Sequence, residues 1–223
     1  MFSSDSFSLI LMMVALSLLP FVAMVATSYL KIVVVMSLIR NALGIQSIPP
    51  NMVINALALI LTFYILAPRF SQSWDTVTSK MEANKPETVF RSDILAEAGE
   101  PFRDFLIQET GEKQLAFFVH TAENLWATKD EDGKLVPATV DAKSYFVLVP
   151  AFCVSELTKA FQIGFLVYLP FIAIDIIISN ILLAMGMMMV SPVTISLPFK
   201  LLLFVMVDGW TLLIHGLVQS YMH

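Results

Sequence analysis

Residues 144–190 read SYFVLVPAFCVSELTKAFQIGFLVYLPFIAIDIIISNILLAMGMMMV, a run of 47 positions with three charged side chains. About 20 apolar residues in a helix cross the hydrocarbon core of a bilayer. As a single helix this run would be roughly 70 Å long, more than twice the thickness of that core. We therefore expect a membrane-type segment that turns back or bends near Leu169-Pro170. A last apolar run follows over 199–218.

The composition separates hydrophobic flanks from a polar middle. It is 57% hydrophobic and 14% charged, against roughly 45–50% and about 25% in soluble proteins. Of the 31 charged residues, 23 lie between Arg69 and Lys143. We predict N-terminal hydrophobic helices over 1–68, a polar domain over 69–143 and C-terminal hydrophobic helices over 144–223. The net charge of −5 disfavours a nucleic-acid partner, which requires a basic surface.

The N-terminal block predicts two membrane helices. Residues 7–30 are uncharged, with Pro20 expected to kink that helix, and a second helix is expected over 52–67. Because the first helix lacks a basic start, we expect it to be retained rather than removed as a signal peptide. Lys31 and Arg40 flank the connection with no acid to balance them. The positive-inside rule therefore places this connection in the cytoplasm and the polar middle outside.

The polar middle predicts a small helical domain outside the cytoplasm. Pro101 suits a first helical turn, and apolar residues then recur at helical spacing. A second amphipathic helix is predicted over 115–126 by the same spacing. Residues 129–133 (KDEDG) read as a solvated turn. The sequence as a whole therefore predicts an all-α fold of membrane-type helical hairpins with a small helical domain between them.

A methionine cluster ends the long apolar run. Met185, Met187, Met188 and Met189 precede a proline-bounded segment, 191–198, that we expect not to be helical. Irregular backbone at membrane depth is tolerated chiefly where it is buried or lines a cavity. The unbranched thioether adapts to irregular neighbours, so the cluster is consistent either with core filling or with a flexible apolar ring around a hole.

Five charged residues lie in the C-terminal apolar stretch: Glu156, Lys159, Asp175, Lys200 and Asp208. An ionised side chain at membrane depth costs about 2.5–3.5 kcal/mol on insertion scales, so such groups normally pair with one another. We expect pairing between helices or between subunits. The alternative is a small-solute or proton transporter in which Glu156, Lys159 and Asp175 form a relay.

Signatures of catalysis are nearly absent. The sequence contains no zinc-protease helix motif, no phosphate-binding loop, no dinucleotide fingerprint and no serine elbow. Asp175 and Asp208 could imitate an intramembrane aspartyl pair, but no Gly-x-Gly-Asp accompanies them. We expect no catalytic residue, no metal ligand and no cofactor.

The chain resembles the FliP/YscR family in both hydrophobic blocks, whereas the middle carries little of the resemblance. The matching stretches are 40–44 (RNALG), 150–164 (with PAF, SEL and AFQIG), 170–175, 185–192 (MGMMMVSP), 197–200 (LPFK) and 208–210 (DGW). Members are R-type core components of the bacterial type III secretion export apparatus. The short N-terminus is more similar to the virulence injectisome branch than to the flagellar one.

The resemblance implies a function that composition alone does not indicate. About five copies would assemble in a ring-like or helical array with S-type and T-type subunits and further export gate components. This array would form a pore for unfolded secreted proteins in the inner membrane, with the middle domain periplasmic. The methionines from Met185 to Met189 would form its gasket. Glu156 and Lys200 would pair between neighbouring copies, with Asp175 close to the same network.

Overall fold

The computed structural model describes residues 4–45, 47–83, 92–129, 134–187 and 189–222. The chain forms two compact units. Unit 1 comprises Met1–Leu30 and Leu66–Glu156, and unit 2 comprises Lys31–Ile65 and Leu157–His223. Two long helices contribute to both units. The three-part division expected from charge stays a prediction.

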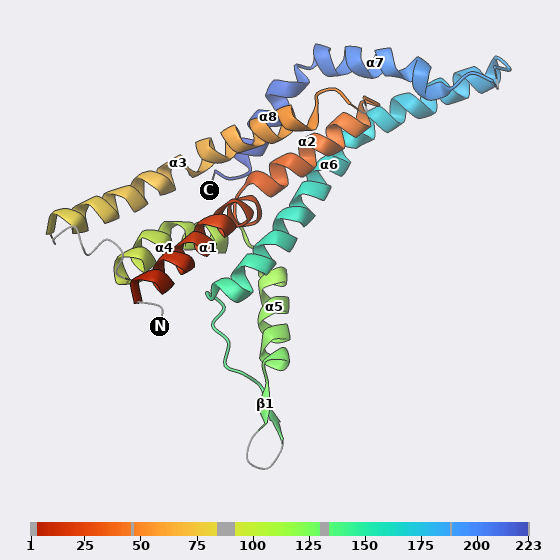
Figure 1. The fold of residues 1–223 in the computed structure, drawn as a ribbon. Coiled ribbons are helices and arrows are strands. Elements are labelled where there is room, and N and C mark those ends of the chain that lie inside the picture. Colours follow the sequence, from red (N-terminus) through yellow and green to blue (C-terminus); the bar gives the residue numbers. More distant parts are fainter. Residues whose placement is uncertain (1–3, 46, 84–91, 130–133, 188, 223) are drawn as a thin grey trace. The chain divides into compact units, whose positions relative to one another are not determined.

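The described residues are mostly helical (Figure 1), with one short strand pair. The elements are α1 (Ser4–Val25), α2 (Tyr29–Ala42), α3 (Asn51–Ala83), α4 (Ser92–Glu109), α5 (Glu112–Leu125), β1 (Thr128–Lys129), β2 (Leu135–Val136), α6 (Tyr145–Ala184), α7 (Pro192–Met206) and α8 (Gly209–Gln219). Among the residues that the structure describes, two helices, α3 and α6, are long and apolar enough to cross a membrane, and the number rises to at most four if each bent pair of helices is one span. The prediction of a largely helical, membrane-type chain is confirmed.

Helix α6 does not turn back near Leu169-Pro170, so of the two expected outcomes, a turn or a bend, the turn is wrong. It continues as one 40-residue helix through both Pro150 and Pro170. A proline removes one backbone N–H and crowds one carbonyl. An apolar segment nevertheless keeps its remaining helical bonds, because no water competes for the backbone groups in an apolar medium.

The N-terminal helices also differ from the expectation. The first helix ends at Val25, and α2 then runs from Tyr29 to Ala42, so the connection predicted between Lys31 and Arg40 is wrong. Ile32, Val35, Met36 and Ile39 are buried, and their i, i+3, i+4, i+7 spacing favours an amphipathic helix despite the flanking charges.

Helices α3, α4 and α7 extend beyond their expected limits because each of them accommodates a proline. Helix α3 continues past Pro68, and Pro101 lies inside α4 rather than in its first turn. The segment 191–198 is largely helical, contrary to expectation, because α7 begins at Pro192 and includes Pro198. Proline at the first helical position loses no hydrogen bond, since that N–H has no partner within the helix. The last apolar run is divided, with α7 and α8 bent by 61°.

Unit 1 contains the amphipathic helices of the polar middle. Helix α5 confirms the helix predicted over 115–126. The rings of Phe105 in α4 and Phe152 in α6 lie 5.7 Å apart, and both are buried. Beyond α5, β1 and β2 pair antiparallel; no sequence pattern predicts these strands. Most of the predicted turn 129–133 lies outside the described residues.

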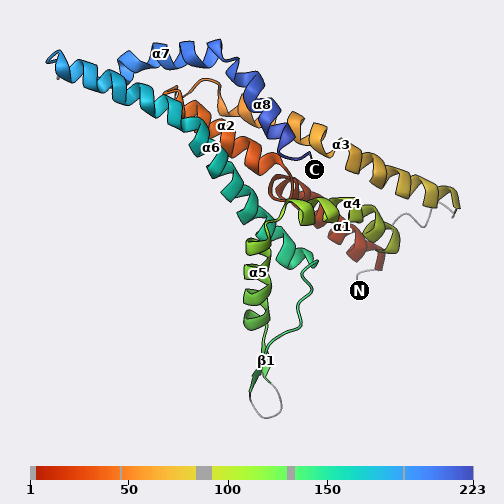
Figure 2. The same cartoon turned by 180° about the vertical axis from the view of Figure 1, so that it is seen from behind.

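Unit 2 is organised around the close approach of α2 and α6, which lie side by side in Figures 1 and 2. A Cβ added at Gly164 of α6 would lie 2.3 Å from Cδ1 of Leu38 in α2. Glycine therefore allows this contact, as small residues do in membrane helix pairs. Gly216 in α8 offers a contrast, because a Cβ added there would meet nothing within 4 Å.

We expect opposite effects from alanine at these two glycines. Gly216→Ala should raise the melting temperature in detergent, because alanine is favoured over glycine in a helix by about 1 kcal/mol. Gly164→Ala should lower it, because overpacking costs about 1–3 kcal/mol and exceeds that gain. Shifts in the same direction would contradict a close α2–α6 contact.

Candidate functional site

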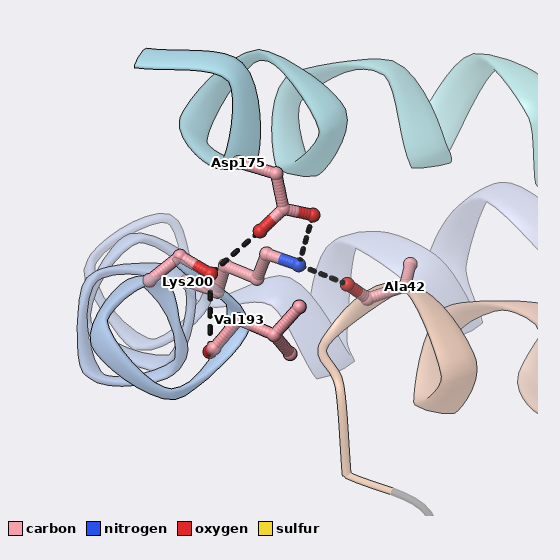
Figure 3. A network of polar contacts seen from close by, with 5 residues as sticks. Ala42, Asp175, Val193 and Lys200 are labelled. Carbon is pink, nitrogen blue, oxygen red and sulfur yellow. Dashed lines mark hydrogen bonds and ion pairs between the residues drawn. The ribbon is translucent and has the colours of Figure 1, made fainter. Parts of the chain in front are cut away.

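A buried lysine joins three helices of unit 2 (Figure 3). Lys200 of α7 is 4% exposed, and its Nζ lies 2.6 Å from Oδ2 of Asp175 in α6. The same nitrogen donates a hydrogen bond of 3.2 Å to the carbonyl oxygen of Ala42, the last residue of α2. Asp175 and Lys200 have no oppositely charged neighbour close by in the sequence, and the fold pairs them between α6 and α7. The lysine also binds the end of α2.

The carboxylate of Asp175 is held from both sides. Ser196 lies four residues before Lys200, so both side chains share one face of α7. The Oγ of Ser196 lies 2.5 Å from Oδ1 of Asp175 and 3.2 Å from the carbonyl oxygen of Val193. A single hydroxyl proton serves one acceptor at a time, and the charged, closer carboxylate is the stronger one. Each oxygen of Asp175 therefore has its own donor.

The third partner of Lys200 arises from the way α2 ends. Gly44 has a φ of +78°, and the N–H groups of Gly44 and Ile45 bond to the carbonyls of Asn41 and Arg40. This is a Schellman motif, which satisfies two of the four C-terminal carbonyls. Lys200 takes the Ala42 carbonyl, and a cation at a helix C-terminus is favoured by the helix dipole.

The methionine segment follows a second motif of the same kind. The N–H groups of Gly186 and Met187 bond to the carbonyls of Leu183 and Leu182, and Gly186 has a φ of +74°. Helix α6 therefore ends sharply at Ala184. The methionines that follow are exposed: Met185 by 59%, Met187 by 43% and Met189 by 100%. Met188 lies outside the described residues.

Glu156 and Lys159 lie one turn apart on α6. Glu156 is fully buried and belongs to unit 1, whereas Lys159 is half-buried and belongs to unit 2. Both residues take part in further interactions. The pairing of Glu156 with Lys200 between copies stays a prediction.

Three further polar groups have positions that no sequence motif predicts. Ser196 could have been identified by its spacing of four from Lys200. The Ala42 carbonyl has no sequence signal beyond the glycine that follows at Gly44. Lys31 also has an unexpected place, because it is buried with its Nζ 3.5 Å from the centre of the Tyr221 ring.

The fold and this site define a class of protein: a helical membrane protein with a buried ion pair and an exposed methionine loop. The chain belongs to the FliP family, whose pattern matches residues 12–217. The resemblance predicted from the motifs is therefore confirmed.

Individual relatives cover nearly the whole chain. Yop proteins translocation protein R of Yersinia pestis is 50% identical over 218 residues, 97% of each chain. Hypersensitivity response secretion protein HrcR of Ralstonia nicotianae is 46% identical over 219 residues, 96% of each chain. Flagellar biosynthetic protein FliP of Bacillus subtilis is 41% identical over 218 residues, 98% of this chain and 93% of the relative.

We expect the two partners of the buried ion pair to respond unequally to replacement. Asp175→Leu leaves the buried ammonium of Lys200 without its counter-ion, so it should cost about 3 kcal/mol of stability. Lys200→Met leaves a carboxylate that is 32% exposed and still bonded to Ser196, so it should cost about 1–2 kcal/mol. The measurement is unfolding by SDS titration in detergent micelles.

The double variant Asp175→Leu/Lys200→Met provides the control for this cycle. It should recover most of the loss, because an apolar pair of similar volume replaces a buried ion pair at little cost. Additive losses in the double variant would contradict the pairing, and equal losses in the two single variants would contradict the argument from the unequal burial of the two partners.

Proposed function

We propose that the chain is an R-type core subunit of a type III secretion export apparatus, acting in protein export across the bacterial inner membrane. Membership of the FliP family supports a role in export. The names of the relatives, which refer to Yop translocation, hypersensitivity response secretion and flagellar biosynthesis, support the export apparatus as its setting. The virulence branch is favoured by the two relatives with the higher identity.

In this proposal several copies, about five by family resemblance, assemble with S-type and T-type subunits around a pore for unfolded proteins. The apolar helices α3 and α6 support a membrane location. The polar residues 69–143 would face the periplasm, with the hydrophobic residues 1–68 and 144–223 packed against the membrane and the other subunits.

The observation that carries the pore is the exposed methionine loop at the end of α6. Met185, Met187 and Met189 are exposed, and Met188 lies between Met187 and Met189 in the sequence. A pore for unfolded chains of any sequence requires a wall without fixed polar preferences, which flexible thioethers provide. A narrow apolar ring also excludes water when it is empty, which blocks ions.

The export function requires no catalytic residue, metal or cofactor in this subunit, because the work is the passage of a chain through a hole. The four charges of Glu156, Lys159, Asp175 and Lys200 would serve assembly. The competing transporter predicts ion flux through the purified chain alone, whereas a subunit of a larger pore gives little flux until its partners assemble.

Replacing the methionines should make the closed pore leak. The variant Met187→Ala/Met188→Ala/Met189→Ala should raise ion conductance of assembled complexes in planar bilayers several-fold, because alanine is too short to close an apolar constriction.

Met52 and Met206 provide matched controls for this test, because both are exposed methionines outside the loop. Alanine at these positions should leave conductance unchanged. Normal assembly of the triple variant with unaltered leakage would contradict the proposal that the methionine loop closes the pore. Equal leakage in the control variants would show that the effect is not specific to this loop.

Charge reversal distinguishes the two partners proposed for Lys200. Lys200→Glu should abolish oligomer formation, because it opposes Asp175 with a second acid. If Lys200 bridges copies, Glu156→Lys should restore the oligomer, and if its main partner lies within the chain, Asp175→Lys should do so. Native mass spectrometry of the extracted complex measures both. An intact oligomer in Lys200→Glu alone would contradict a role for this charge in assembly.

A further inference from the structure

An apolar groove lies beside the connection between α2 and α3 in unit 2. Its volume is about 440 Å³, within the roughly 300–1,000 Å³ that ligand sites occupy. The connection and the starts of α3 and α8 contribute apolar walls, among them Ile48, Val53 and Trp210. Leu201 and Val205 of α7 complete the groove. Ile48, Val53 and Val205 are largely exposed.

Arg40 is the charged residue in this otherwise apolar lining. Its Nη1 donates to the carbonyl oxygen of Pro49 at 3.2 Å and to Oδ1 of Asn51 at 2.5 Å. Both acceptors are neutral. Its Nε is buried and has no hydrogen-bond partner among the described residues. Among the residues that the structure describes, no carboxylate lies within 4 Å of the Arg40 guanidinium.

The positive charge at the groove is therefore not neutralised within the described chain. Arg40 lies in the last turn of α2, where the helix dipole, equivalent to about half a negative charge, offsets only part of the unit charge of the guanidinium. An arginine binds phosphate more strongly than it binds neutral amides, through charge-assisted hydrogen bonds. An apolar groove with such a cation is complementary to an anionic amphiphile, which has an apolar chain and a negatively charged group.

We propose that this groove binds one anionic phospholipid, with the phosphate at Arg40 and an acyl chain along the apolar walls. Basic pockets between membrane helices bind anionic headgroups. Trp210 supports a position of the groove at the level of the lipid headgroups, because tryptophan is enriched where the hydrocarbon meets the headgroups. A second copy of the chain could cover the apolar walls, but it would leave Arg40 unneutralised unless it brought an acid. This lipid site is independent of the pore.

Trp210 provides a local probe for the test. The other tryptophans, Trp74 and Trp126, belong to unit 1, so Trp74→Phe/Trp126→Phe leaves Trp210 as the sole emitter. This full-length protein is reconstituted in vesicles in which brominated phosphatidylglycerol or brominated phosphatidylcholine replaces a fixed fraction of the lipid. Bromine quenches only a nearby indole. We expect an apparent association about fivefold stronger for the anionic lipid, as one basic residue near the membrane surface provides.

Two variants remove the charge by different routes. Arg40→Gln deletes the guanidinium, and Asn51→Asp neutralises it in place while keeping a hydrogen-bond acceptor for Nη1. Either variant should reduce the ratio of anionic to zwitterionic lipid association to about one, whereas Arg40→Lys should retain most of the preference for the anionic lipid. Asn124→Asp adds the same charge in unit 1 and serves as the matched control, with the preference unchanged. Asn51→Asp decides the result if Arg40→Gln does not fold.

The walls are tested separately by Val53→Phe, which fills the groove and should weaken quenching by both brominated lipids. Val193→Phe is the control, because Val193 is exposed but does not line the groove. No preference for the anionic lipid in the parent protein would overturn the proposal, as would a preference that survives Asn51→Asp. Protection of Trp210 from both lipids would identify a protein occupant instead.

Discussion

The burial of one ammonium group among apolar helices governs the arrangement of unit 2. A charged lysine removed from water is stable only where a counter-charge and further acceptors surround it. Asp175 supplies the charge, and the Ala42 carbonyl supplies an acceptor that its own helix cannot use. Because Asp175, Ala42 and Lys200 belong to α6, α2 and α7, satisfying a single nitrogen fixes these three helices relative to one another.

Two glycines with positive φ determine where functional groups are presented. Gly44 turns the chain after α2 and leaves the Ala42 carbonyl available to Lys200, while Gly186 ends α6 and exposes the methionines. An L-residue in this conformation is strained, because its Cβ crowds the backbone. In both places the sequence pattern is a glycine that closes an apolar helix, and both lie in motifs that revealed the family.

Sequence patterns predicted the properties that depend on local composition. The hydrophobic flanks, the polar middle, the helix α5 and the family all followed from composition, periodicity and motifs. The helix limits failed mainly at prolines, because rules for proline assume that water or a turn can take over the freed backbone groups. Pro170 lies within an apolar segment where continuing the helix satisfies more of those groups than a turn would.

The polar contacts of the site were less accessible to sequence. Asp175 and Lys200 were recognised as charges in need of partners, but they lie 25 residues apart on different helices, so only the fold shows that they bind each other. The position of Arg40 in a groove depends equally on the approach of α7 and α8 to the start of α3. The burial of Lys31 is not predictable from the sequence, because a basic residue after an apolar run is typical of the end of a membrane helix.

The interleaving of the two units sets an order for biosynthesis. Unit 1 requires residues up to Glu156 and unit 2 requires residues up to the end of the chain. The helix that ends at Ala42 therefore emerges from the ribosome 158 residues before the lysine that caps it. Throughout that interval the Ala42 carbonyl at the end of α2 lacks its hydrogen bond from Lys200, which can form only after α7 has been translated.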